Sequence, residues 1–162
     1  MKQKKDRYIT RSGEAGRIII SRLKPGSDLL TSLKSIAREE NLRSGIILSA
    51  VGALKKAGLR NLKNLPGEYP ITDENRSFKN FEDIFEILAI SGNVFMEEGE
   101  IQVHAHVVLS GIKGAQISVI GGHLIEGCEV GGFAEIMLME VDELELEKLF
   151  DEETKTTQLF SD

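Results

Sequence analysis

The stretch Ile101-Gln-Val-His-Ala-His-Val-Val-Leu109 carries two of the three histidines of the chain and predicts a β-strand. Its β-branched and large apolar residues favour extended backbone, in which residues two apart point to the same face. His104 and His106 therefore share one face, roughly 7 Å apart along the backbone. The third histidine, His123, follows two glycines on the next predicted strand, so a sheet can bring all three imidazoles together.

These three histidines predict a metal site. Two imidazoles at this spacing can bind one ion at about 2.0–2.1 Å when a neighbouring strand offers a third, which leaves an open coordination position. Zn²⁺ is the expected ion, although imidazole also suits iron, copper and nickel. The alternative is that hydrogen bonds within the sheet satisfy the histidines, because any half-buried strand can carry two polar residues on one face.

Length and composition indicate one ordinary core. The chain has 162 residues, of which 41% are hydrophobic, and this predicts one domain over residues 16–150. A basic arm (residues 1–15) is expected before it and an acidic and polar tail (residues 151–162) after it. The sequence contains no apolar run of membrane-spanning length and no apolar stretch typical of a secretory signal at its start. We therefore expect a cytoplasmic protein with no membrane partner.

Cys128 is the single cysteine of the chain, which excludes an internal disulfide and suits a reducing compartment. We expect a small buried side chain at this position. Because Cys128 is near His123 in the sequence, a role as a fourth, soft metal ligand is the alternative.

The charge of the chain argues against attraction of the whole molecule to nucleic acid. The net charge is −6, whereas phosphate binding depends on clustered Lys and Arg that displace counterions. The basic arm is the exception, since it could contact phosphates without sequence specificity. Its basic residues are Lys2, Lys4, Lys5, Arg7 and Arg11.

Patterning along the chain predicts an α+β fold with a mostly antiparallel sheet and one main amphipathic helix. Apolar residues recur at helical spacing from Leu29 to about Leu42, after a capping side chain at Ser27 or Asp28. Residues 58–62 are expected as the hairpin partner of a strand over 45–54, and residues 64–80 as an exposed loop. Residues 144–150 alternate like a strand but consist of good helix formers, so the choice between strand and helix stays undecided. Further strands are expected over 16–23, 85–90, 101–109, 115–120 and 134–141, and a strand followed by a turn over 93–100.

Several familiar motifs are absent from the sequence. No Gly-x-x-x-x-Gly-Lys-Ser/Thr stretch occurs, and no Gly-x-Gly-x-x-Gly follows a strand, which removes the simplest nucleotide-binding hypotheses. A Gly-x-Ser-x-Gly nucleophile elbow is also missing.

Four segments, in order, carry a resemblance to a known family: Phe85-Glu-Ile-Leu-Ala-Ile-Ser-Gly92, His104-Ala-His106, Gly121-Gly-His-Leu124 and Phe133-Ala-Glu-Ile136. From about residue 16 to 141 the chain resembles the plants-and-prokaryotes-conserved (PPC) domain, which follows AT-hook motifs in plant nuclear proteins. The resemblance implies a compact α+β fold, a homotrimer and a metal held by His104, His106 and His123. The chain lacks the Gly-Arg-Pro core of an AT-hook, which weakens the case for minor-groove binding.

Three functions remain open. The first is a metal-binding protein that binds or processes a small metabolite; a bound Zn²⁺ would lower the pKa of its water to about 7, and Glu135 is then the candidate proton acceptor. An alternative interpretation of Glu135 is a carboxylate at the surface or in a trimer interface. The second function is a DNA-binding or regulatory protein without an AT-hook. The third is a scaffolding trimer whose histidines only pack.

Overall fold

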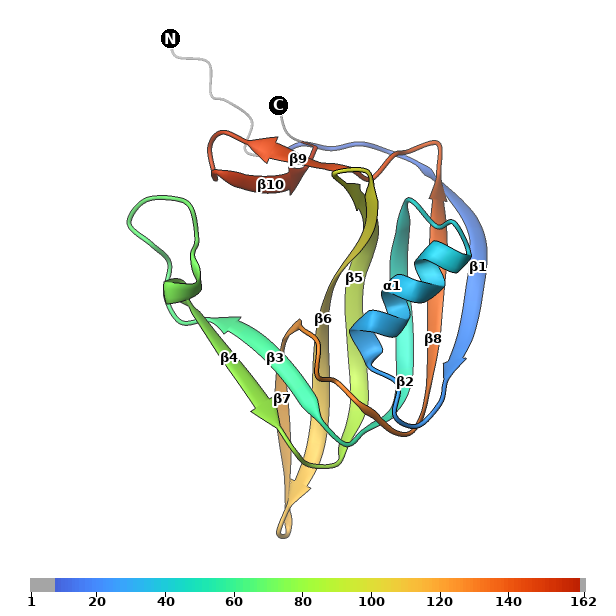
Figure 1. Cartoon of the computed structure of the whole chain (residues 1–162), viewed down its shortest axis with the longest axis vertical. Helices are drawn as coiled ribbons and strands as arrows, with labels where there is room; N and C mark the ends of the chain where they lie inside the picture. The colour runs from blue at the N-terminus through green and yellow to red at the C-terminus, as the bar shows by residue number, and fades with distance from the viewer. Residues whose placement is uncertain (1–7, 161–162) are drawn as a thin grey trace.

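The computed structural model describes residues 8–160, which form an eight-stranded sheet with one α-helix on one face (Figure 1). Neighbouring strands pair antiparallel throughout, in the order β1-β8-β2-β5-β6-β7-β3-β4. This confirms the mostly antiparallel sheet. The strands are β1 Glu14–Leu23, β2 Gly45–Leu54, β3 Ala57–Leu62, β4 Arg76–Phe81, β5 Phe85–Glu97, β6 Glu100–Lys113, β7 Gln116–Leu124 and β8 Val130–Asp142.

Helix α1 (Leu29–Glu39) covers the central strands. It begins where Asp28 accepts a hydrogen bond from the backbone N–H of Thr31 at 2.9 Å, one of the two capping residues expected. Its buried side chains are spaced at helical intervals, namely Leu29, Leu30, Leu33 and Ala37. Full burial of a leucine contributes about 1.5–3 kcal/mol, so this face fixes the helix on the sheet.

Alternation along β6 separates the core from the site. Ala105, Val107 and Leu109 are buried in the core that α1 covers. His104 and His106 lie between them in sequence and therefore point to the opposite face of the sheet. One face of β6 thus packs in the core, and its other face carries two of the three histidines.

The predicted pairing of residues 58–62 with β2 is wrong. Strand β2 pairs with β5 and β8, whereas β3 pairs with β7 and β4. Both edges of β2 are taken by strands distant in sequence, so adjacency along the chain does not decide the pairing. As a consequence, β3 lies beside the strand that carries His123.

The predicted loop over residues 64–80 is also partly wrong. Its last part forms a short 3-10 helix, η1 (Asp73–Asn75), and most of strand β4, which pairs with β3 along its whole length. Polar residues dominate this hairpin because much of it is exposed, and such a composition resembles that of a loop.

The end of the described chain forms a second, two-stranded sheet, β9 (Lys148–Asp151) with β10 (Thr156–Leu159). The undecided segment therefore ends in a strand, and the predicted tail contributes β10. The chain before β9 is attached to the sheet where Met96 N–H donates to Leu146 O at 2.8 Å. In Figure 1 this hairpin and the η1 loop both lie to the left of β5 and β6, the hairpin above and the loop below.

Of the predicted basic arm, Lys2, Lys4, Lys5 and Arg7 lie outside the described residues, while Glu14 and Ala15 already belong to β1. Within residues 8–160, α1 is the one α-helix, and its 11 residues are too few to cross a bilayer.

Candidate metal centre

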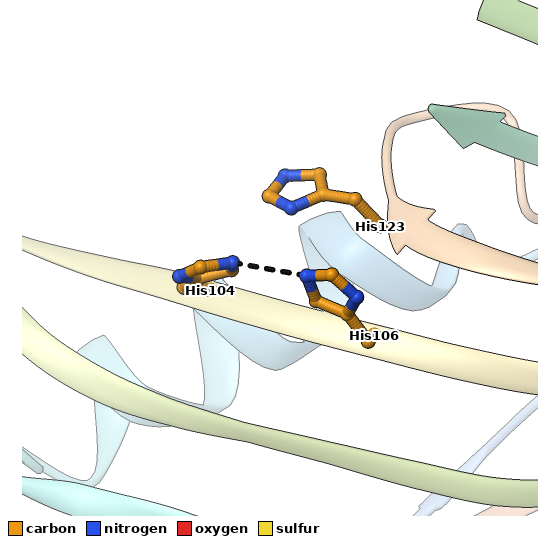
Figure 2. A group of neighbouring side chains, drawn as sticks. All are labelled: His104, His106 and His123. Carbon is orange, nitrogen blue, oxygen red and sulfur yellow. Dashed lines mark hydrogen bonds between the residues drawn. The ribbon is translucent and has the colours of Figure 1, made fainter. Parts of the chain in front are cut away.

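The three histidines lie together on one face of β6 and β7. His106 and His123 are direct partners in the β6–β7 register, and His104 lies two residues before His106. The ring centroids are 5.3 Å apart for His104 and His106, 4.8 Å for His104 and His123, and 5.2 Å for His106 and His123. Figure 2 shows the rings gathered around a common space. The expected convergence of the three imidazoles is confirmed.

The separations suit a small cation. One nitrogen from each ring lies within 4.8 Å of the other two, and the Nε2 atoms of His104 and His106 are 3.3 Å apart. Two nitrogens bound at 2.0–2.1 Å in tetrahedral geometry lie about 3.3–3.4 Å apart, so this pair already has the required spacing.

Burial and nearby cations keep two of these imidazoles neutral. Burial, followed by the positive charge of Lys148, lowers the pKa of His104 to about 4. Burial, followed by Arg60, lowers the pKa of His123 to about 3. A neutral imidazole has a free nitrogen lone pair, which is the form that binds a metal.

Local backbone packing fixes the histidine strands. A Cβ at Gly92 on β5 would lie 2.1 Å from His104 O, so only glycine allows this close approach of β5 to β6. On the other side, the Asn61 side-chain amide donates to Gly121 O at 2.9 Å and joins β3 to β7 beside His123.

A buried acceptor lies beside the first histidine. Asn93 on β5 is the cross-strand partner of His104, and its Oδ1 atom is buried and has no hydrogen-bond partner among the described residues. Histidines that bind metals usually donate their second ring N–H to such an oxygen. The donor set and this free acceptor both fit a metal held by imidazoles.

Three cations surround the histidines, and the sequence analysis did not identify them. Arg60 on β3 is the cross-strand partner of His123. Arg76 begins β4 and lines a cavity of about 530 Å³ together with Arg60 and all three histidines. Lys148 on β9 lines the neighbouring cavity with His104. Basic residues on strands usually face solvent, and only the β3–β7 pairing would have placed Arg60 here.

The other candidate residues lie elsewhere. Cys128 is buried in the core, where its Sγ accepts from Gly58 N–H at 3.2 Å, so the expected buried side chain is confirmed. It is not part of the histidine group, which argues against a fourth ligand. Glu135 lies on β8, which β2 and β5 separate from β6. It lines a different cavity, with Arg22 and Lys24.

Comparison with known sequences gives a family and two cyanobacterial relatives. Residues 10–142 match the family described as the Plants and Prokaryotes Conserved (PCC) domain. The bifunctional protein GlmU from two Synechococcus strains is 35% identical over 122 and 124 residues, which are 75% and 76% of this chain. The chain spans only 16% and 17% of the length of those relatives.

Solved structures share the fold. A metal-containing protein from Archaeoglobus fulgidus is 28% identical, with a TM-score of 0.76 over 95% of this chain and 100% of that chain. A plant- and prokaryote-conserved protein from Pyrococcus horikoshii is 30% identical, with a TM-score of 0.69 over 93% and 96%. A proposed DNA-binding protein from Ralstonia eutropha has a TM-score of 0.68 over 88% and 90%, and its 22% identity supports likeness of fold alone.

Proposed function

The chain belongs to the Plants and Prokaryotes Conserved (PCC) domain family, as its sequence predicts, and from this premise we propose that it is a homotrimeric metal-binding protein. His104, His106 and His123 are the proposed ligands, and Zn²⁺ is the proposed ion. The observation that carries the proposal is the approach of three imidazole nitrogens to within 4.8 Å of one another. The metal-containing neighbour from A. fulgidus supports it.

The proposed role is to bind or process a small metabolite. A Zn²⁺ ion with three neutral imidazole ligands keeps its positive charge and an open coordination position, so it supplies Lewis acidity to a bound ligand. The chain itself holds the imidazoles of His104 and His123 neutral, mainly through burial and also through the charges of Lys148 and Arg60. Asn93 is proposed to orient the His104 ring.

No catalytic side chain is assigned within one copy of the chain. Glu135 would serve as a proton acceptor only if a second copy of the chain carried it to the histidines, because β2 and β5 lie between its strand and β6. The proposal covers two roles, binding a metabolite and processing it. Both roles depend on the metal.

Elemental analysis tests the metal site. Protein purified without chelator or a histidine tag is expected to carry close to one metal ion per chain, and the His104→Ala variant should lose it. Gln102→Ala is the matched control, because it changes the same strand outside the histidine group and should retain the ion. Less than about a tenth of an equivalent in the wild-type protein would contradict the proposal.

Self-association is supported by apolar side chains on the sheet face opposite α1. Contiguous exposed apolar surface of this kind is typical of protein interfaces. The exposed residues are Ile18, Ile20, Leu48, Val51, Leu88, Val108 and Met137.

A second proposal is nucleic-acid association through the basic arm, without an AT-hook. It is supported by the fold shared with a proposed DNA-binding protein and by the basic residues before Gly13. Counterion release then predicts a steep dependence of binding on salt. If deletion of residues 1–12 leaves a gel shift unchanged, this second proposal is removed.

A further inference from the structure

We propose that the space beside the three histidines binds a small organic oxyanion, a carboxylate or a phosphate, through Arg60, Arg76 and Lys148. This inference rests on the proposed metal site and names the class of ligand that the site takes. It is carried by the shape of the cavities and by the placement of the three cations in them.

Two cavities meet at the histidines. The first, of about 530 Å³, is lined by Arg60, Arg76 and the three imidazoles. The second, of about 500 Å³, is lined by Lys148 and Asn93 among others. Ile71, Arg76 and His104 line both cavities, so the two spaces are adjacent. Volumes of about 300–1,000 Å³ are typical of sites for small molecules.

The cations in this space are only partly neutralised. Asp73, an acidic neighbour of Arg60, forms an ion pair with Arg76 at 2.9 Å. Arg60 and Arg76 line the same cavity. Burial, followed by the charge of Arg76, lowers the pKa of Arg60, so the two guanidinium groups repel each other. An anion between them would relieve this repulsion, and Arg is well suited to bind carboxylate or phosphate with two hydrogen bonds.

Lys148 adds a third positive charge from the opposite side. Its ammonium lies 4.2 Å from the centre of the Phe95 ring, and its charge reaches both His104 and His123. Glu97, the acidic neighbour of Lys148, accepts a hydrogen bond from Thr157. A divalent ion on the neutral imidazoles would make this region more positive still, although the chain as a whole has a net charge of −6.

The far wall of the second cavity favours a small polar molecule. It carries the hydroxyl groups of Thr154, Thr156 and Thr157 and the amide of Gln158. These groups can bond to hydroxyl or carbonyl groups of a metabolite whose anionic end lies at the cations. The positive charges are gathered in one concave space rather than along a stripe, which favours a metabolite over a nucleic-acid backbone.

Calorimetric titration of Co²⁺-loaded protein tests the inference, with inorganic phosphate and succinate as the two anions. The metal content of the same samples is measured by elemental analysis. Wild-type protein is expected to bind at least one of the two anions, and the better one identifies the preferred group. Arg60→Gln and Lys148→Gln should each weaken binding about tenfold to a hundredfold, the usual effect of losing a hydrogen bond to a charged group. The Co²⁺ content should not fall, because burial, the larger cause of the lowered pKa of His104 and His123, remains in both variants.

Arg43→Gln and Lys79→Gln are the matched controls, because each removes the same charge outside these cavities. They should alter anion affinity less than about twofold. Protein that takes up no Co²⁺ would contradict both the metal site and this inference. Protein that takes up Co²⁺ but binds neither anion, or binds only an oligonucleotide, would contradict the anion site alone. So would equal affinities in Arg60→Gln and Arg43→Gln.

Discussion

Cys128 shows how burial decides the chemistry of a single residue. Its side chain is fully buried, and burial raises the pKa of the thiol to about 11. The Sγ atom also exchanges hydrogen bonds with the backbone of Gly58, accepting from its N–H at 3.2 Å and donating to its carbonyl at 3.3 Å. A residue close in sequence to His123 is therefore a structural thiol rather than a metal ligand.

We predict that Cys128 reacts slowly with a thiol reagent in the native protein. At pH 8 a thiol with a pKa near 11 is ionised about a hundredfold less than one with an ordinary pKa. Because folding raises the pKa of this acid, its contribution to stability is present below pH about 9 and is lost as the pH rises towards 11. The reaction rate of Cys128 is measured by the absorbance change after addition of a disulfide reagent, with guanidinium-unfolded protein as the reference. Equal rates in the two states would mean that the 125–130 segment opens readily.

The histidines could be predicted from the sequence, and the cations beside them could not. Alternation on a strand is local, so His104 and His106 share a face whatever the rest of the fold does. Arg60 and Lys148 reach the site only through long-range pairing, one on β3 and the other on β9. Which strands become neighbours depends on the whole sheet.

At the scale of elements, the contact between β3 and β7 is short and includes one side-chain hydrogen bond. The two strands share only the register pairs Leu59 with Leu124 and Arg60 with His123. Asn61 strengthens this contact through its bond to Gly121 O. A Cβ at Gly122 would lie 2.7 Å from Nδ2 of Asn61 and 3.0 Å from Arg60 O, so a side chain there would displace the Asn61 amide and crowd the β3 backbone.

We predict that Asn61→Ala and Gly122→Ala weaken the same contact. Loss of the Asn61 bond should cost about 0.5–1.5 kcal/mol of unfolding free energy, and Gly122→Ala should cost more because it also crowds the β3 backbone. The double variant should cost less than the sum, since both changes remove one interaction. Denaturant unfolding measures this, with the exposed Asn64→Ala as control. Strictly additive effects would show that Asn61 and Gly122 act independently.

Other errors in the predicted elements also come from long-range structure. Residues 85–90 and the first part of 93–100 are expected as two separate strands, but they form the single strand β5. The turn expected at the end of 93–100 is present after it. The interruption at Gly92 reflects the close approach of β6 rather than a turn. Residues 45–54 are a strand with the bounds expected. Ile47, Ala50 and Leu54 of this apolar run are buried in the core, whereas Leu48 and Val51 are exposed on the opposite face.

At the scale of the whole molecule, the sheet has two unlike faces. One packs against α1 and forms the core. The opposite face carries the histidines and also the exposed apolar residues of β1, β2, β5 and β8, including Ile20 and Leu88. One face of a protein with net charge −6 thus offers both a polar site and an apolar surface. Association of copies would cover the apolar part.

We predict that Leu88→Glu converts the proposed trimer to a monomer. Leu88 is 55% exposed and lies at the register shift of β5 between Ile87 and Ala89. A charge there leaves the folded chain intact, but in an interface it would be buried without a partner. An unpaired buried charge of this kind costs several kcal/mol. Light scattering after size exclusion should give three chains per particle for the wild-type protein and one for the variant. Leu65→Glu, at an exposed loop leucine away from this sheet face, is the control and should stay trimeric. A wild-type mass of one chain, or a Leu88→Glu trimer, would contradict the use of this face for self-association.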